Sequence, residues 1–193
     1  MSFFENLYKQ LFSTADKPID ISETLIRSDE FIADFQKWKN SPRSTELIKK
    51  VKIAYDLKKA GAESDLYLSL YNSIYANGFF FEFNNSMSKN DFLYLFDYFR
   101  EIVLKFGYFL STSDKRTREK AGNLEITEKH YLKPQNRNQE GLLDQLYGNV
   151  LIEHVSTNNI PSYIKIMANI YADSNYKKPL EFDEFVERLL SSD

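Results

Sequence analysis

Apolar residues recur every three or four positions through most of the first half of the chain, which is the spacing of one face of an α-helix. The pattern predicts five helices, over about residues 2–12, 28–40, 42–60, 64–77 and 90–106. Turn residues support these bounds, because Ser41 precedes Pro42 at one helix start and Gly61, Gly78 and Gly107 follow helix ends. The segment Phe79–Phe83 is too short for a helix, and it is either a buried strand or an extended connector.

The helix expected at 90–106 is apolar around most of its circumference. Its four charged residues occupy an arc of about 140° on a helical wheel, and they are Asp97, Arg100, Glu101 and Lys105. A helix with so little polar surface is covered on most sides, so we expect it to pack on a sheet at the centre of the protein.

From residue 108 the apolar positions change to every second residue, as in half-buried strands. Leu124, Ile126 and Leu132, for example, alternate with polar neighbours. The pattern predicts two hairpins, with strands over about 108–118, 123–132, 149–156 and 162–172. Pro179 then precedes a last helical pattern, whose apolar face contains Phe182, Phe185, Val186 and Leu189.

Helices followed by strands indicate an α+β fold. We expect about five N-terminal helices, then a four-stranded antiparallel sheet of two hairpins, then a C-terminal helix. No repeat of 20–50 residues and no low-complexity linker divides the chain. The sequence therefore predicts a single domain over 1–193, with a helical half at 1–106 and the sheet with the terminal helix at 107–193.

Composition excludes several chemistries. The chain has 193 residues, a net charge of −3, six glycines and no cysteine. Without cysteine there is no disulfide, thiolate metal site or thiol nucleophile. The closest glycines, Gly141 and Gly148, are seven positions apart, which is too far for a glycine-rich phosphate loop. The N-terminal segment lacks the features of a secretory signal, so we expect a cytoplasmic protein. We also expect that the protein does not bind membranes and that it carries no cofactor.

Only two histidines are present, so any imidazole site must use His130 or His154. Glu128 and His130 are two residues apart on a predicted strand and hence share a face. If the two hairpins are neighbours, Glu128, His130 and His154 can meet as a site of two histidines and one carboxylate. The other interpretation is an ordinary Glu–His pair at the margin of the sheet. These three residues are the only catalytic candidates, and we expect no resident metal.

The first predicted hairpin is rich in basic residues, with Arg116 and Arg118 near its turn. Basic groups next to aromatic rings on a sheet are typical of RNA recognition. Acidic residues interleave with them, however, and residues 107–133 carry a net charge of only +2. A solvated hairpin explains the same pattern.

Aromatic residues are abundant, with sixteen Phe, thirteen Tyr and one Trp. Phenylalanines fall mainly on the predicted inner faces, where they fill the core. Thirteen tyrosine hydroxyls are costly to bury, so we expect several tyrosines at the surface. A surface tyrosine is a good residue for binding a partner, because it offers a large area at a low cost in entropy. We single out Tyr163, Tyr171 and Tyr176.

These observations lead to three functional hypotheses. The first is a non-enzymatic module that binds another protein through its sheet or a tyrosine-rich margin, with a homodimer as one form of this association. The second is a small-ligand or metal-dependent enzyme that uses the His/Glu cluster. The third is a nucleic-acid binder that uses the basic hairpin.

Overall fold

The computed structural model describes residues 28–72, 76–83, 87–134, 149–168 and 182–191. The helices in these ranges are α3 (Asp29–Lys39), α4 (Pro42–Lys59), α5 (Lys89–Lys105) and α6 (Phe182–Leu190). The strands are β1 (Leu68–Asn72), β2 (Asn77–Glu82), β3 (Tyr108–Lys120), β4 (Asn123–Pro134), β5 (Val150–Thr157) and β6 (Ile160–Ala168). The helix expected at 2–12 and the part of the last strand beyond residue 168 lie outside the described residues.

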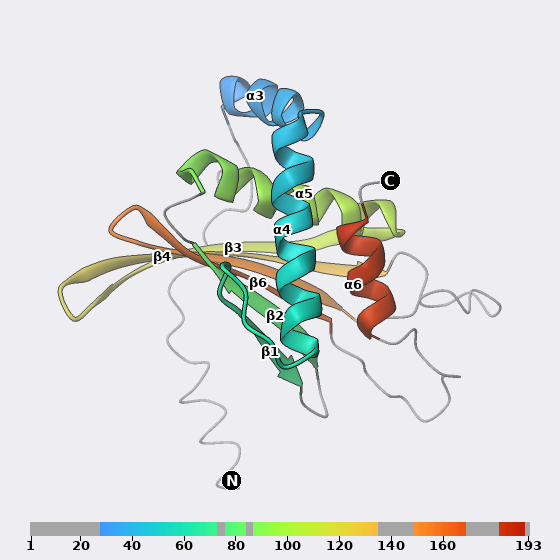
Figure 1. The fold of residues 1–193 in the computed structure, drawn as a ribbon. Helices are drawn as coiled ribbons and strands as arrows, with labels where there is room; N and C mark the ends of the chain where they lie inside the picture. Colours follow the sequence, from blue (N-terminus) through green and yellow to red (C-terminus); the bar gives the residue numbers. More distant parts are fainter. Residues whose placement is uncertain (1–27, 73–75, 84–86, 135–148, 169–181, 192–193) are drawn as a thin grey trace, which may run out of the picture.

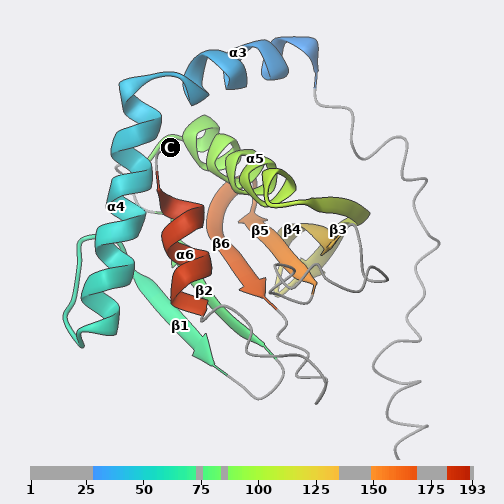
Figure 2. The ribbon, with the colours of Figure 1, turned by 90° about the vertical axis from the view of Figure 1, so that its right-hand side faces the viewer.

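The six strands form one antiparallel sheet in the order β1-β2-β6-β5-β4-β3. The helices lie on one face of this sheet (Figure 1), and the view along the sheet shows α5 and α6 inside its curve (Figure 2). We call the covered side the helix face and the opposite side the open face. The α+β class and the antiparallel sheet were both predicted.

The helix expected at 64–77 is wrong. Residues in this range form β1 and the start of β2, so the sheet has six strands rather than four. Leu68 and Leu70 point to the helix face and alternate with Ser69 and Tyr71, which is a strand pattern. Tertiary pairing decides the conformation here, because β2 pairs with β6 from the second half of the chain. Of the five helices expected before the sheet, α3, α4 and α5 are present in the described residues.

The other elements agree with the sequence. Ser41 caps α4, with Pro42 in its first turn, and Gly61 and Gly107 take positive φ values after helix ends. Both predicted hairpins are present. Their turns have positive φ at both central residues, which are Ala121 with Gly122 and Asn158 with Asn159. This conformation matches the twist of two-residue hairpins.

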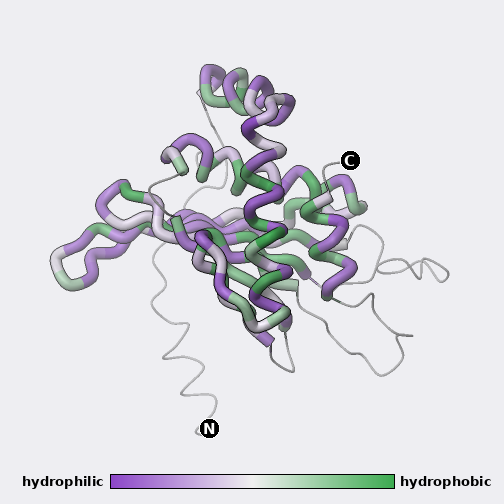
Figure 3. The backbone as a smooth tube through the Cα atoms, viewed as in Figure 1, coloured by the Kyte–Doolittle hydropathy of each residue, from purple (hydrophilic) through white to green (hydrophobic). Residues whose placement is uncertain are grey.

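The core lies between α5 and the helix face of the sheet. Phe92, Phe96 and Phe99 of α5 are fully buried against it. From the sheet, the largest fully buried residues are Phe79, Phe81, Leu132, Ile152, Ile164 and Ile166. The expected packing of the central helix on the sheet is thus confirmed, and α6 adds Phe185, Val186 and Leu189 to the same core. Figure 3 shows hydrophobic and hydrophilic residues alternating around α4, which covers the same layer.

One buried carboxylate ties three helices together. Asp91 lies in the first turn of α5 and accepts hydrogen bonds from Trp38 Nε1 (2.9 Å), Arg43 Nε (2.9 Å) and Ser88 Oγ (2.6 Å). Trp38 belongs to α3 and Arg43 to α4, while Ser88 caps α5. Burial would raise the pKa of Asp91, but the hydrogen bonds outweigh burial and hold that pKa below its ordinary value.

Replacing this carboxylate should therefore loosen the helical layer. We expect Asp91→Asn to lower the free energy of unfolding by about 1–3 kcal/mol at pH 7, measured by urea denaturation. The lowered pKa means that the carboxylate stabilises above its unfolded pKa of about 3.9 and that this contribution is lost as the pH falls. The difference in the free energy of unfolding between the parent and Asp91→Asn should therefore become smaller below about pH 4. Asp34→Asn is the control, because Asp34 is exposed and forms an ion pair with the exposed Lys37 three residues away. An equal loss of unfolding free energy in Asp34→Asn would contradict the role assigned to Asp91.

Gly78 is required by close packing within the sheet rather than by a helix end. A Cβ at this position would lie 2.6 Å from Ile166 O and 2.9 Å from Met167 Cγ, both on β6. We expect Gly78→Ala to lower the free energy of unfolding by about 1–3 kcal/mol in the same denaturation assay. A variant as stable as the parent would show that β2 and β6 can separate at no cost.

Candidate functional site

The three candidate catalytic residues meet on the helix face of the sheet. Glu128 and His130 lie on β4, and His154 lies on β5 as the register partner of Glu128. Glu128 bridges the two rings, since its Oε1 is 3.2 Å from His130 Nε2 and its Oε2 is 3.2 Å from His154 Nε2. The sequence left two interpretations open, a meeting of all three residues or a Glu–His pair at the margin of the sheet. In the structure the three side chains meet, and they lie in the interior.

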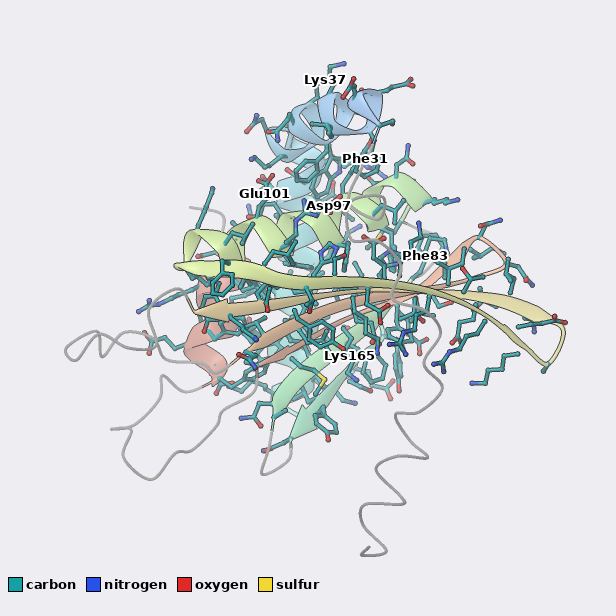
Figure 4. All side chains as sticks on the ribbon, turned by 180° about the vertical axis from the view of Figure 1, so that it is seen from behind. Phe31, Lys37, Phe83, Asp97, Glu101 and Lys165 are labelled. Carbon is teal, nitrogen blue, oxygen red and sulfur yellow. The ribbon has the colours of Figure 1, made fainter. Side chains whose placement is uncertain are left out.

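The ring of Phe96 from α5 packs against both imidazole rings. Its centroid is 4.6 Å from that of His130 and 4.7 Å from that of His154. Glu128, His130 and His154 are 3%, 0% and 4% exposed. Two further polar residues lie at this level of the core, namely Ser113, the register partner of His130, and Asp97 of α5, which pairs with Arg100 at 3.0 Å. Figure 4 shows Asp97 on the helix side of the sheet.

The buried position of His130 disfavours its protonation. His154 Nε2 and Glu128 Oε2 form a hydrogen bond. His130 Nε2 lies 3.2 Å from Glu128 Oε1, but within the described part of the chain it has no hydrogen-bond partner. Among the described residues, neither Nδ1 has a hydrogen-bond partner. Burial lowers the pKa of His130, and the nearby Arg100 lowers it further, against the opposing effects of Glu128 and Asp97.

A reaction needs substrate access and a metal needs ligands at the right geometry. The three side chains have almost no exposed surface. Within the ranges that the structure describes, no group of three or more histidine, aspartate or glutamate residues is placed to hold a metal ion. The arrangement is a buried set of polar contacts between β4 and β5.

The lowered pKa of His130 has a measurable consequence. The unfolded chain takes up a proton on this residue near pH 6.5 while the folded protein resists it, so stability is lost as the pH falls below that value. We expect the free energy of unfolding to decrease from pH 7.5 to 5.5, by at most about 1.4 kcal/mol per pH unit for one such group. His130→Gln should make this dependence shallower.

Denaturation at several pH values and NMR titration of the two histidine C2–H signals provide the measurements. The signal that is missing from the spectrum of the variant is that of His130, because the chain has two histidines. An unchanged pH dependence in His130→Gln would contradict the assignment.

The open face of the sheet is rich in large apolar side chains. One row crosses it from β1 to β4 through register partners, and it consists of Tyr71, Gly78, Met167, Leu151 and Tyr131. Tyr71 is 47% exposed and Tyr131 is 36% exposed. A second group of rings consists of Tyr67, Phe80 and Tyr163. The centroid of the Phe80 ring is 6.3 Å from that of Tyr67 and 5.9 Å from that of Tyr163. Phe109 of β3, the register partner of Lys133, is also exposed.

A row of alternating charge runs beside the apolar row. Lys165, Glu153, Lys129 and Asp114 are register partners across β6, β5, β4 and β3. Glu153 accepts from Lys129 Nζ at 2.7 Å and from the Tyr163 hydroxyl at 3.1 Å. Burial and the neighbouring Glu153 raise the pKa of Tyr163, so its hydroxyl keeps the proton that it donates to Glu153. Figure 4 shows Lys165 on the side of the sheet away from the helices.

The predicted binding residues have different outcomes. Tyr163 lies on the open face, opposite to Ile164 as expected, and Arg116 and Arg118 are exposed on β3. Tyr171 and Tyr176 lie outside the described residues. Sequence reasoning missed Tyr67, Tyr71 and Phe80 because it took residues 64–77 as a helix and left Phe79–Phe83 open between a buried strand and an extended connector. The available signal was the alternation of these rings with Leu68, Leu70 and Phe81.

Comparisons with protein-family models, with curated proteins and with solved structures find no match for this chain. Among the described helices, none combines the length and the apolar character that crossing a membrane requires.

Proposed function

We propose that the protein is a non-enzymatic interaction module that binds another protein through the open face of its sheet. The observation that carries this proposal is the row from Tyr71 to Tyr131, which presents large apolar side chains on a face that the described helices leave uncovered. Tyrosine favours such contacts because it offers a large area at a low cost in side-chain entropy.

The side chains of the open face are also held in place before any partner binds. Met167 lies across Gly78, and Tyr163 is fixed by its hydrogen bond to Glu153. Backbone pairing on both sides keeps β2, β6, β5 and β4 in register. A pre-organised surface loses less conformational entropy on binding, so even a modest apolar area gives useful affinity.

The His/Glu cluster supports the proposal from the other side of the sheet. His130 has no exposed surface, and Phe96 of α5 packs on its ring, so a substrate approaching from the helix side would require Phe96 to move out of the core. An enzyme that uses the cluster would need that opening in every turnover. A role in holding β4 and β5 together requires no movement at all.

Paired variants test the proposal. We expect Tyr71→Thr/Tyr131→Thr to weaken a specific partner interaction at least tenfold while the thermal unfolding midpoint changes by only a few degrees. Threonine keeps β-propensity at both positions and removes the rings. The measurement is quantitative affinity capture with parent and variant proteins, followed by titration of the recovered partner.

The matched control is Ile32→Ala/Ile53→Ala, which removes two exposed apolar side chains from α3 and α4. Light scattering of the purified protein shows whether the partner is a second copy of the chain. Equal capture by the parent and by Tyr71→Thr/Tyr131→Thr would overturn the proposal, and so would loss of the partner only in the helix control.

A further inference from the structure

The basic residues of the β3–β4 hairpin divide unequally between the two faces of the sheet. Side chains on alternate positions of a strand point to opposite faces, and the register places those of β3 and β4 together. On the open face the hairpin carries five basic and two acidic residues, a net charge of +3, which are Arg116, Arg118, Lys120, Lys129, Lys133, Asp114 and Glu125. On the helix face it carries Lys115, Glu119 and the buried Glu128. A hairpin that is nearly neutral as a sequence is thus clearly basic on one side.

The outermost basic residues lie on an edge strand. β3 is the last strand in the order, so in the described part of the chain one of its sides pairs with no other strand. Such an edge presents a row of backbone N–H and C=O groups that can pair with an added strand. The pairing of β3 with β4 is uninterrupted from Thr112 to Lys120, beyond the irregularity after Leu110. This stretch is long enough for a peptide of about eight residues. In Figure 1 the β3–β4 hairpin extends past the helices, and Figure 3 shows mostly hydrophilic residues there.

We propose that an extended acidic peptide of a partner protein binds along β3 as an added strand, with its carboxylates against Arg116, Arg118 and Lys120. This proposal rests on the proposed function, whose partner it describes. Residues of an added strand that lie opposite these three side chains point to the same face, with Cβ atoms about 4.5–5.5 Å apart. Carboxylates at every second position of the peptide therefore meet the basic side chains in register.

Charged residues on an edge strand also protect a protein from unwanted pairing. Protection of the edge and binding of an acidic peptide are compatible here. The same arginines repel a basic strand, disfavour an apolar strand and attract an acidic strand. Arg116 keeps an internal contact with Asp114 at 2.7 Å, which orients its guanidinium on the surface. The side chain remains half exposed, so the group can also bind a partner carboxylate.

The observations favour a peptide over a nucleic acid. The free backbone groups of an edge strand match a peptide backbone directly. The whole chain is acidic, whereas domains that bind nucleic acid are usually strongly basic.

The test uses the full chain and three fluorescein-labelled probes. These are an eight-residue peptide of alternating Glu and Val, the same peptide with Lys in place of Glu, and a twelve-nucleotide oligouridine. We expect the Glu peptide to bind measurably by fluorescence anisotropy at 50 mM NaCl and several-fold more weakly at 300 mM, because salt screens exposed charges. The Lys peptide should not bind, and the oligouridine should bind at least tenfold more weakly than the Glu peptide.

Two double variants make the test specific. Arg116→Glu/Arg118→Glu should weaken binding of the Glu peptide at least tenfold. The control Lys49→Glu/Lys58→Glu makes the same change in net charge on exposed residues of α4 and should bind like the parent. Amide shifts in NMR spectra should change mainly between residues 112 and 120. Circular dichroism confirms that each variant is folded.

Three results would overturn the inference: equal binding by Arg116→Glu/Arg118→Glu and the parent, amide shifts confined to other strands, or tighter binding of the oligouridine. Its failure can be told apart from failure of the proposed function. If the captured partner is lost by Tyr71→Thr/Tyr131→Thr and kept by Arg116→Glu/Arg118→Glu, the open face binds a protein but β3 does not receive its acidic strand.

Discussion

The stripe of phenylalanines on α5 is the contact on which the rest of the molecule depends. Phe92, Phe96 and Phe99 are four and three residues apart, so they share one face of the helix, and all three are fully buried. Phe99 reaches Phe81 of β2, while Phe96 reaches the histidines of β4 and β5. One helix thereby holds strands from both halves of the chain. The apolar residues on the covered side of the sheet are used in this contact, whereas the described helices leave the open face uncovered.

The same contact explains why two histidines and a glutamate can lie in the core. Phe96 packs on both imidazole rings and excludes water, while Glu128 supplies each ring with a polar neighbour at 3.2 Å. Buried polar groups of this kind add little net stability, but they penalise wrong arrangements strongly. A shift of β4 against β5 by one residue would move Glu128 to the open face and leave His154 without its partner. The cluster is therefore well suited to fix the register of the two central strands, and that register in turn sets the rows of the open face.

Much of this fold could be predicted from the sequence, and the exceptions have physical causes. The two hairpins, α4 with its Ser41–Pro42 start and the central position of α5 follow from local pattern and turn chemistry. The segment at 64–77 does not, because Leu66, Leu70 and Tyr71 fit a helical face while Leu66, Leu68 and Leu70 fit a strand face. The pairing of Phe79 with Ile166 decides between these two patterns, and it joins residues that are far apart in the chain. For the candidate site, the meeting of Glu128 with both histidines was foreseeable, but its burial was not, since burial depends on where Phe96 lies.

The fold also distributes the charged residues of the β3–β4 hairpin unequally between the two faces of the sheet. Along the sequence, Arg116 and Arg118 are offset by Asp114, Glu119 and Glu125, and the hairpin looks like an ordinary solvated surface. In the folded protein Glu119 points to the other face and Glu128 is enclosed beneath Phe96, so neither offsets the arginines where a partner would approach. Because β3 is the last strand of the sheet in the described ranges, these arginines also lie beside backbone groups that pair with no other described strand. Net charge along a sequence therefore underestimates how basic a sheet surface is whenever acidic residues occupy the positions of the opposite face.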